Sequence, residues 1–225
     1  MWLFNSSIGK KVVMSLTGIC LILFLTFHMS MNVAALFSGE AYNMICEFLG
    51  ANWYAVVATL GLAALAVIHI VYAFILTAQN RAARGNERYA VTEKPSKVEW
   101  ASQNMLVLGI IVIVGLLVHL YNFWAKMMLV DLVGCGDFVH SADGAYWIKE
   151  TFSNAGYVVL YVIWVVSLWF HLTHGFWSAL QTLGLNGKVW FCRWKAIGIA
   201  YTTVLCLGFI AVILGYYICS VCGCC

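Results

Sequence analysis

Charge is the scarcest property of this chain. Only 9% of its 225 residues are Asp, Glu, Lys or Arg, whereas 64% are hydrophobic. A soluble domain carries about 25% charged residues, because water must solvate its surface. The composition therefore excludes an ordinary soluble globular protein and predicts a protein embedded in a membrane.

Proline is almost absent as well. The single proline, Pro95, lies in a polar loop, so no long apolar run contains one. Broken membrane helices, which many transporters use to build a midplane site, are therefore not expected. The apolar runs also lack the alternating pattern of a membrane β-barrel, which excludes that fold.

Five apolar runs exceed the roughly 20 residues that a helix needs to cross a bilayer. They cover approximately residues 11–37, 52–80, 101–129, 155–182 and 196–218. The first run is longer than the apolar core of a signal peptide, so we expect it to be retained. We predict an all-α membrane protein in which residues 1–225 form a single transmembrane domain. The first four helices form a bundle able to bind a cofactor.

Basic residues predict the orientation of these helices. Most of them precede the first run or lie between runs two and three and runs four and five. These are Lys10, Lys11, Arg81, Arg84, Arg88, Lys94, Lys97, Lys188, Arg193 and Lys195. The positive-inside rule places them in the cytoplasm, with the N-terminus inside and the C-terminus outside. The loop between runs two and three serves as an orientation signal or docks a cytoplasmic partner.

The chain closes on "CSVCGCC", which holds four cysteines in seven residues. A zinc or iron–sulfur site needs four ligands in good geometry. Such a site is one interpretation of this segment, and an unstructured tail is the one we favour.

Histidine is the polar residue that enters the apolar runs. Five of the six histidines lie inside them, and His140, in an outside loop, is expected to be solvated. An ionisable residue inside a membrane helix is costly and usually functional. For any single histidine, a structural hydrogen bond between helices is the alternative.

The depths of these histidines form a pattern. With a helix rise of 1.5 Å per residue, His28 and His119 lie roughly 24 and 28 Å above the inner ends of their helices. His69 and His171 both lie at about 16 Å, and His174 lies near 12 Å. The first four helices therefore contribute one histidine each to an outer pair, His28 and His119, and an inner pair, His69 and His171.

Two opposed neutral imidazoles are the usual axial ligands of a six-coordinate haem iron. Because protein then fills both axial positions, such a site favours electron transfer over oxygen chemistry. Zinc would need two further ligands at each level. A di-iron bundle would need inward Glu-x-x-His motifs, and hard cations would need carboxylates, which the middles of the runs lack.

Two kinds of neighbouring residue fit this interpretation. His174, one turn toward the cytoplasm, would bond a haem propionate or a quinone, or simply a neighbouring helix; an exchange of roles with His171 stays open. Small residues lie near the predicted ligands and leave room for a flat macrocycle or for close helix contact. These are Gly18, Gly109, Gly115 and Gly175.

Four segments carry a family resemblance: "SLTGICLILFLTFH", "LAVIHIVYAF", "LLVHLYNF" and "FHLTHGFWSALQTLG". With its four-histidine spacing, the chain resembles the single-chain, five-helix, di-haem cytochrome b subunit (b558 type) of succinate dehydrogenase and fumarate reductase. The resemblance covers nearly the whole chain. It implies two haem b groups, the outer one held by His28 and His119 and the inner one by His69 and His171.

The resemblance also implies partners and a location. A flavoprotein subunit and an iron–sulfur subunit would bind the cytoplasmic face of a bacterial inner membrane. Electrons would pass between the iron–sulfur subunit and menaquinone through the haems. The dicarboxylate chemistry would belong to the flavoprotein, so the chain itself would be an electron-transfer and quinone-binding subunit.

Finer roles follow from the same resemblance. Ser15 would contact a propionate of the inner haem, or else bond its own helix backbone. Gly175 matches a family glycine four residues after the fourth ligand. Glu47 or Glu40 would assist quinol oxidation, or else be an ordinary solvated carboxylate. Trp169 stands where some members carry a glutamate used for proton movement, so no such proton path is expected here.

Two other functions compete with this one. The chain could be the haem b subunit of a hydrogenase, formate dehydrogenase or nitrate reductase, which also use paired histidines. It could also be a small transporter that relays protons through histidines. Bound haem separates the first class from the second.

Overall fold

The computed structural model describes residues 6–50, 52–84, 99–134 and 141–223. Within these ranges the chain is helical and contains no strand, which confirms the predicted all-α class. Most of the polar loop between the second and third runs, and His140, lie outside the described residues. The elements are α2 (Ser7–Ala34), α3 (Gly39–Phe48), α4 (Trp53–Arg84), α5 (Trp100–Gln103), α6 (Met105–His119), the π-helix η1 (Leu120–Leu129), α7 (Val130–Val133), α8 (Gly144–Phe152), α9 (Ala155–Thr182) and α10 (Trp190–Cys222).

Five helical segments are long and apolar enough to cross a membrane. They are Ser7–Ala34, Trp53–Ala83, Met105–Val133, Ala155–Thr182 and Trp190–Cys222. Each of the five predicted runs corresponds to one of them, with its ends shifted by a few residues. The architecture is that of a multi-pass membrane protein.

Side-chain caps set where several helices begin. Ser6 accepts a hydrogen bond from the Gly9 amide at 2.9 Å before α2. Asn154 accepts one from the Gly156 amide at 2.8 Å before α9. Each cap satisfies an amide that has no partner inside its helix. After α9, Gly184 has a φ of 80°, a left-handed conformation that lets the chain turn back toward α10.

The expectation of an unstructured cysteine tail is wrong for its first half. Helix α10 continues through Cys222 and ends at Gly223, whose φ is 68°. Cysteine and valine are apolar, so they extend the apolar run, and the glycine supplies the left-handed residue that stops the helix.

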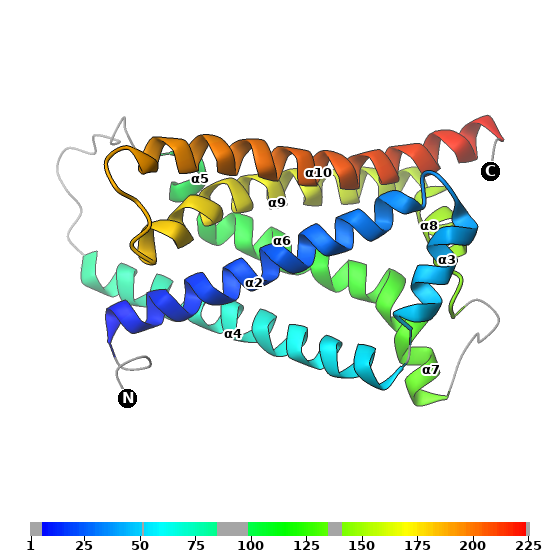
Figure 1. The fold of residues 1–225 in the computed structure, drawn as a ribbon, viewed down its shortest axis with the longest axis horizontal. Coiled ribbons are helices and arrows are strands. Elements are labelled where there is room, and N and C mark those ends of the chain that lie inside the picture. The colour runs from blue at the N-terminus through cyan, green and yellow to red at the C-terminus, as the bar shows by residue number, and fades with distance from the viewer. Residues whose placement is uncertain (1–5, 51, 85–98, 135–140, 224–225) are drawn as a thin grey trace.

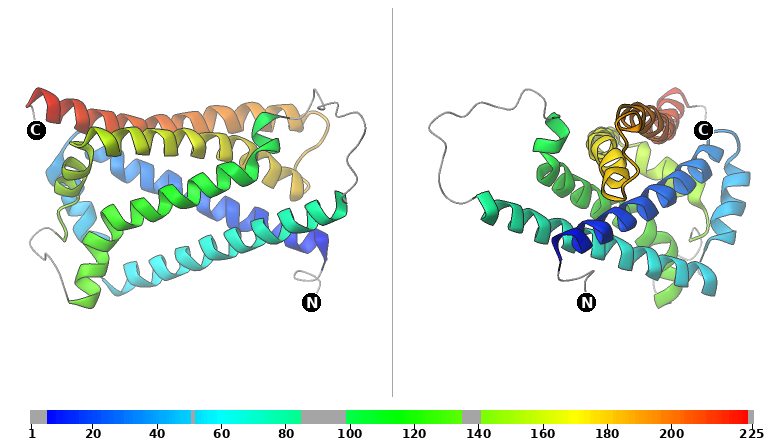
Figure 2. Two further views of the ribbon diagram at one scale, coloured as in Figure 1. Left: turned by 180° about the vertical axis from the view of Figure 1, so that it is seen from behind. Right: turned by 60° about the vertical axis from the view of Figure 1, so that its left-hand side comes forward.

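The long helices run side by side, with the two termini at opposite ends (Figure 1). Helix α9 packs against α2, α6 and α10, whereas α4 packs mainly along α2. Figure 2 shows α10 lying on α9 and α4 on the opposite flank of the molecule. Helices α2, α4, α6 and α9 thus form the bundle. In it, α2 packs against α4 and α9, and α9 also packs against α6.

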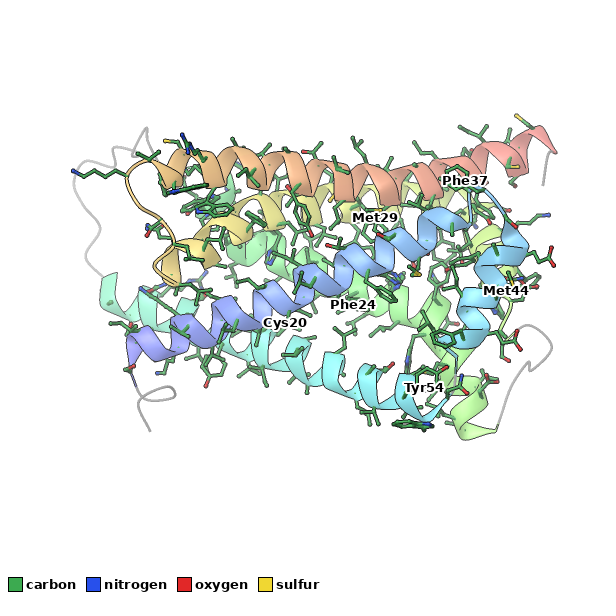
Figure 3. All side chains as sticks on the ribbon, viewed as in Figure 1. Cys20, Phe24, Met29, Phe37, Met44 and Tyr54 are labelled. Atoms are coloured by element: carbon green, nitrogen blue, oxygen red, sulfur yellow. The ribbon has the colours of Figure 1, made fainter. Side chains whose placement is uncertain are left out.

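The best-packed part of the molecule lies around α9 and α10. Its most buried members come from α8, α9 and α10: Ile148, Tyr161, Val165, Leu205, Cys206 and Ile213. Elsewhere, carbon-rich side chains project outward along the helices (Figure 3). Many of them are large and exposed, including Leu23 on α2 and Val57 on α4. This outward apolar surface suits a lipid environment.

Charge differs between the two ends of the bundle. The N-terminal end, here called the basic end, carries Lys10, Lys11, Arg81, Lys188, Arg193 and Lys195. The opposite end, the acidic end, carries Glu40, Glu47, Asp131, Asp143 and Glu150. The prediction that the basic end faces the cytoplasm stays a prediction.

The short helices α3 and α8 cover the acidic end, and neither was predicted. Asn43 on α3 donates to Asp143 Oδ1 at 2.8 Å and accepts from the Ala145 amide at 2.9 Å. The same carboxylate caps α8 by accepting from the Tyr146 amide. We call α3 and α8 together the acidic-end cap.

Candidate functional site

The outer pair joins α2 to α6. The ring centroids of His28 and His119 lie 5.7 Å apart, and their planes cross at 86°. Phe24, labelled in Figure 3, stacks on His28 with centroids 5.4 Å apart and planes at 16°. Four more aromatic rings approach the two imidazoles: Phe123, Tyr161, Trp164 and Phe209. The outer pair is therefore enclosed in aromatic side chains.

The inner pair joins α4 to α9. The ring centroids of His69 and His171 lie 6.4 Å apart, with planes at 65°. The hydroxyl oxygen of Thr17, on α2, lies 3.2 Å from Nδ1 of His69. Sequence reasoning missed Thr17, because no spacing rule links residue 17 to residue 69.

Two glycines show that the pairs lie at different levels. A Cβ built on Gly18 would lie 3.3 Å from the ring of His69, and one built on Gly109 would lie 3.9 Å from that of His171. Each glycine precedes an outer histidine on the same helix by ten residues. Ten residues rise about 15 Å along a helix, so the inner pair lies nearer the basic end by about that length.

Each pair connects two helices that do not pack against each other in the described part of the chain. Neither α2 and α6 nor α4 and α9 pack closely along their backbones within the described residues. Their histidine rings nevertheless meet at the bundle centre. Such facing side chains at the core of a helix bundle are the usual setting of a bound cofactor.

The glycines near the site have different roles. A Cβ on Gly115 would lie 2.0 Å from the indole of Trp164, whose Nε1 donates to the Val112 carbonyl at 3.0 Å. Gly115 therefore serves close contact between α6 and α9. Gly18 and Gly109 instead face histidine rings. A Cβ on Gly175 would meet no heavy atom within 4 Å, so packing does not require a glycine there.

Beyond His119 the helix changes geometry. The segment Leu120–Leu129 is π-helical, a rare form that often occurs at functional sites. Its Asn122 is 1% exposed and donates to the hydroxyl of Tyr161 at 3.2 Å. The ring of Tyr161 lies 6.2 Å from that of His119. No pattern in the sequence pointed to this segment, because a π-helix follows from packing rather than from a local motif.

His174 does not belong to the inner pair. Its ring packs against Trp177 with centroids 4.9 Å apart, and its Nδ1 lies 4.0 Å from Glu99 Oε2. Lys195 donates to the other oxygen of Glu99 at 2.6 Å. The geometry thus pairs His171 with His69 and leaves His174 in a polar cluster at the basic end.

The other predicted site residues make no contact within the described ranges that assigns them a role. Ser15 is buried on α2 toward the basic end. Glu40 and Glu47 are exposed on α3 in the acidic-end cap. Trp169 donates from Nε1 to Thr203 on α10 at 2.9 Å, so it is turned toward α10. The roles that the family resemblance implies for Ser15, Gly175, Glu40 and Glu47 stay predictions.

The two pairs fit a metal that receives its remaining ligands from a macrocycle. Two imidazoles on opposite sides of one ion, with bonds of about 2 Å, have centroids about 6 Å apart. The separations of 5.7 and 6.4 Å match this value. Nδ1 of His119 and Nδ1 of His171 are buried and have no hydrogen-bond partner among the described residues, a costly state for a polar atom.

A metal held by protein ligands alone fits less well. Within the described ranges, no three His, Cys, Asp or Glu side chains come together in a group that could hold an ion. Zinc normally takes three or four protein ligands. The two-ligand geometry therefore favours a haem-type cofactor over a bare ion.

A groove of about 310 Å³ lies between α5–α6 and α9. Its walls are mostly apolar, and its polar members are Asn104 and Ser167. Trp100 and Phe170 meet edge to face at the groove, with centroids 5.1 Å apart. Ser167 stands one helical turn before His171, so the groove lies close to the inner pair. Apolar pockets with a few polar groups are typical of sites for small hydrophobic ligands.

The acidic-end cap contains two titratable side chains in contact, the buried Tyr42 and the half-buried Cys46. Burial raises the pKa of the Cys46 thiol, and burial also raises that of the Tyr42 hydroxyl, which contacts it. Tyr42 donates to Asn32 Oδ1 at 3.1 Å, and the Asn32 amide nitrogen lies 3.4 Å from Nδ1 of His28. The cap is therefore connected to the outer pair through Asn32.

Comparisons of the chain with known protein families, with curated proteins and with solved structures found no match. The functional argument therefore depends on the site itself.

Proposed function

We propose that this chain is the membrane-anchor cytochrome b subunit of a succinate:quinone oxidoreductase or quinol:fumarate reductase. In this role it binds two haem b groups, each between two histidines. It relays electrons between an iron–sulfur subunit and menaquinone. The observation that carries the proposal is the pairing of four histidines from four helices, with ring centroids 5.7 and 6.4 Å apart.

The four paired histidines are the haem ligands in this function. His28 and His119 hold the outer haem, and His69 and His171 hold the inner one. When bound, each haem supplies reversible one-electron transfer. Because two imidazoles would hold each haem, substrate would not reach the iron, which suits a relay. The apolar helix faces and the aromatic rings keep water from the site and hold the imidazoles in place.

The ends of the bundle support the assignment of partners. The basic end is nearer the inner pair and carries most of the described basic side chains. Under the positive-inside rule it faces the cytoplasm, where the iron–sulfur and flavoprotein subunits would bind. The α6–α9 groove beside the inner pair and the acid side chains Glu40 and Glu47 are two candidate quinone positions.

A visible spectrum tests the proposal most directly. The purified membrane protein, reduced with dithionite, should show low-spin b-type haem bands. Extraction with acidic acetone should release two non-covalent haems per chain. If the purified protein is colourless and binds no added haem, the proposal is contradicted and the histidine-relay transporter is favoured.

Co-purification separates the family from other haem b anchors. Gentle solubilisation should retain a flavin-bearing partner and an iron–sulfur partner, together with succinate or fumarate activity. A molybdenum or nickel–iron partner would instead assign the chain to a formate dehydrogenase, nitrate reductase or hydrogenase.

A further inference from the structure

Helix α2 packs closely against the ring of His69 through Thr17 and Gly18. Thr17 is 6% exposed, and its hydroxyl lies 3.2 Å from His69 Nδ1. The neighbouring Gly18 brings the α2 backbone against the same edge of the ring, where a Cβ would lie 3.3 Å from Cε1. The contact thus joins α2, which carries His28 of the outer pair, to His69 of the inner pair on α4.

The contacts of Thr17 are compatible with one simple arrangement of donors and acceptors. The Thr17 hydroxyl lies 2.9 Å from the Val13 carbonyl and 3.0 Å from the Met14 carbonyl. Carbonyl oxygens only accept, so these two contacts fit a hydroxyl proton that is donated to one of them. The Thr17 oxygen is then left to accept, and the hydrogen between it and His69 comes from Nδ1. The Met14 carbonyl, which also interacts with His69, can likewise only accept.

We propose that Thr17 is a positioning residue that holds His69 in its Nδ1–H tautomer and so presents Nε2 as the metal-binding nitrogen of the inner pair. This inference rests on the proposed function. A hydrogen bond at the far nitrogen fixes the ring orientation of a metal-binding histidine and raises the basicity of its other nitrogen. Gly18 supports the same contact, because a side chain at this position would push the His69 ring away from the Thr17 hydroxyl.

The contact with Thr17 distinguishes His69 from the other three paired histidines. In the described structure, Nδ1 of His119 and Nδ1 of His171 have no hydrogen-bond partner. His28 has only the amide of Asn32, on its own helix, at 3.4 and 3.5 Å from its ring nitrogens. Among these four rings, within the described residues, His69 is therefore the one with a short hydrogen bond to a side chain of another helix.

Two variants of the full-length protein test the role of Thr17. Thr17→Val removes the hydroxyl and keeps the branched shape, whereas Thr17→Ser keeps the hydroxyl. We expect Thr17→Val to weaken retention of the inner haem about tenfold or more, the usual cost of losing such a partner. Retention of the outer haem should stay unchanged, and Thr17→Ser should behave like wild type. Thr182→Val is the matched control, because that hydroxyl bonds only its own helix.

A second measurement does not depend on bound haem. In haem-free protein labelled with ¹⁵N-histidine, the His69 signals, assigned with a His69→Ala variant, should report a protonated Nδ1. Thr17→Val should shift them toward a mixture of tautomers, and Thr17→Ser should not. The inference is overturned if wild type and Thr17→Val give the same signals, or if both haems weaken equally. A wild-type protein that binds no haem overturns the proposed function alone, because the tautomer is still read from the haem-free chain.

Discussion

The outer and inner histidine pairs have similar geometry but different surroundings. Around the outer pair, Phe24, Phe123, Trp164 and other aromatic rings pack directly on the imidazoles. The inner pair instead receives a hydroxyl from Thr17 and lies nearer the polar cluster of the basic end. One pair is thus held by apolar packing and the other by a hydrogen bond. Two cofactors with identical axial ligands would therefore experience different environments, which are among the main determinants of a haem potential.

The largest expected effect comes from removing one ligand of each pair. His119→Ala should abolish binding of the outer haem and leave the inner haem bound, and His171→Ala should do the reverse. The reason is that each haem iron would lose one of its two protein ligands. Haem extraction should then find about one haem per chain, with different residual absorption bands in the two variants.

His174→Ala is the control for that experiment. Because His174 lies beside Glu99 and Trp177 rather than opposite His69, the variant should keep both haems. Loss of the inner haem in His174→Ala, with retention in His171→Ala, would exchange the roles of these two histidines.

The packing around the outer pair can be disturbed with a single methyl group. Gly115→Ala would place Cβ 2.0 Å from the Trp164 indole and should destabilise the protein by about 1–3 kcal/mol. Gly109→Ala, whose Cβ lies 3.9 Å from His171, should be neutral or slightly stabilising, because alanine favours helix. Thermal unfolding in detergent compares the two, and equal losses would contradict the difference in packing.

The hydrogen bond between the buried Asn122 and Tyr161, beside the outer pair, can be tested separately. Tyr161→Phe removes its hydrogen-bond partner and should cost about 1–3 kcal/mol, the penalty of an unsatisfied buried amide. The double variant Asn122→Leu with Tyr161→Phe removes both partners and should recover part of that loss. The difference is measured by unfolding, and a double variant as unstable as the sum of the single ones would argue against this hydrogen bond.

The acidic-end cap, which lies beyond the membrane-spanning helices, should respond to pH. The pKa of Cys46 is raised in the folded protein because burial disfavours the thiolate. The protonated thiol therefore stabilises the cap below the ordinary thiol pKa of about 8.5, and this contribution is lost as the pH rises through the folded value. The protection of α3 amides, measured as the exchange rate relative to the base-catalysed intrinsic rate, should fall over that interval.

Cys46→Ala is the control for this pH dependence. It should flatten the response of α3 between pH 8 and about 10, the range below ordinary tyrosine ionisation. Persistence of the same pH response in Cys46→Ala would assign it to another group of the cap.

The smallest effect is expected at the basic end. Lys195→Met removes the ion pair with Glu99, whose two side chains are 29% and 41% exposed. Exposed ion pairs contribute only about 0–1 kcal/mol, and salt screens them further. Unfolding should change within that range and both haems should stay bound; loss of the inner haem would show that this cluster supports the inner pair.

The architecture followed closely from the sequence, and the site followed only in part. The scarcity of charge and the length of the apolar runs were enough to predict five membrane helices, because lipid imposes those features on each segment separately. Helix rise alone placed His28 with His119 and His69 with His171. Local signals were too weak for the short helices α3 and α8, whose caps, such as Asp143, act together with Asn43 on another segment.

Composition, the length of the apolar runs and the positions of the histidines in them determined by themselves that this chain forms long apolar helices and that four of them carry a histidine at one of two depths. Those properties depend on each residue and its neighbours along the chain. Only the tertiary structure decided that His171 rather than His174 faces His69, that Gly115 receives Trp164, and that Thr17 reaches the ring of His69. Each of these contacts depends on the rotation and tilt of one helix against another, which side-chain packing sets and no spacing along a single segment encodes.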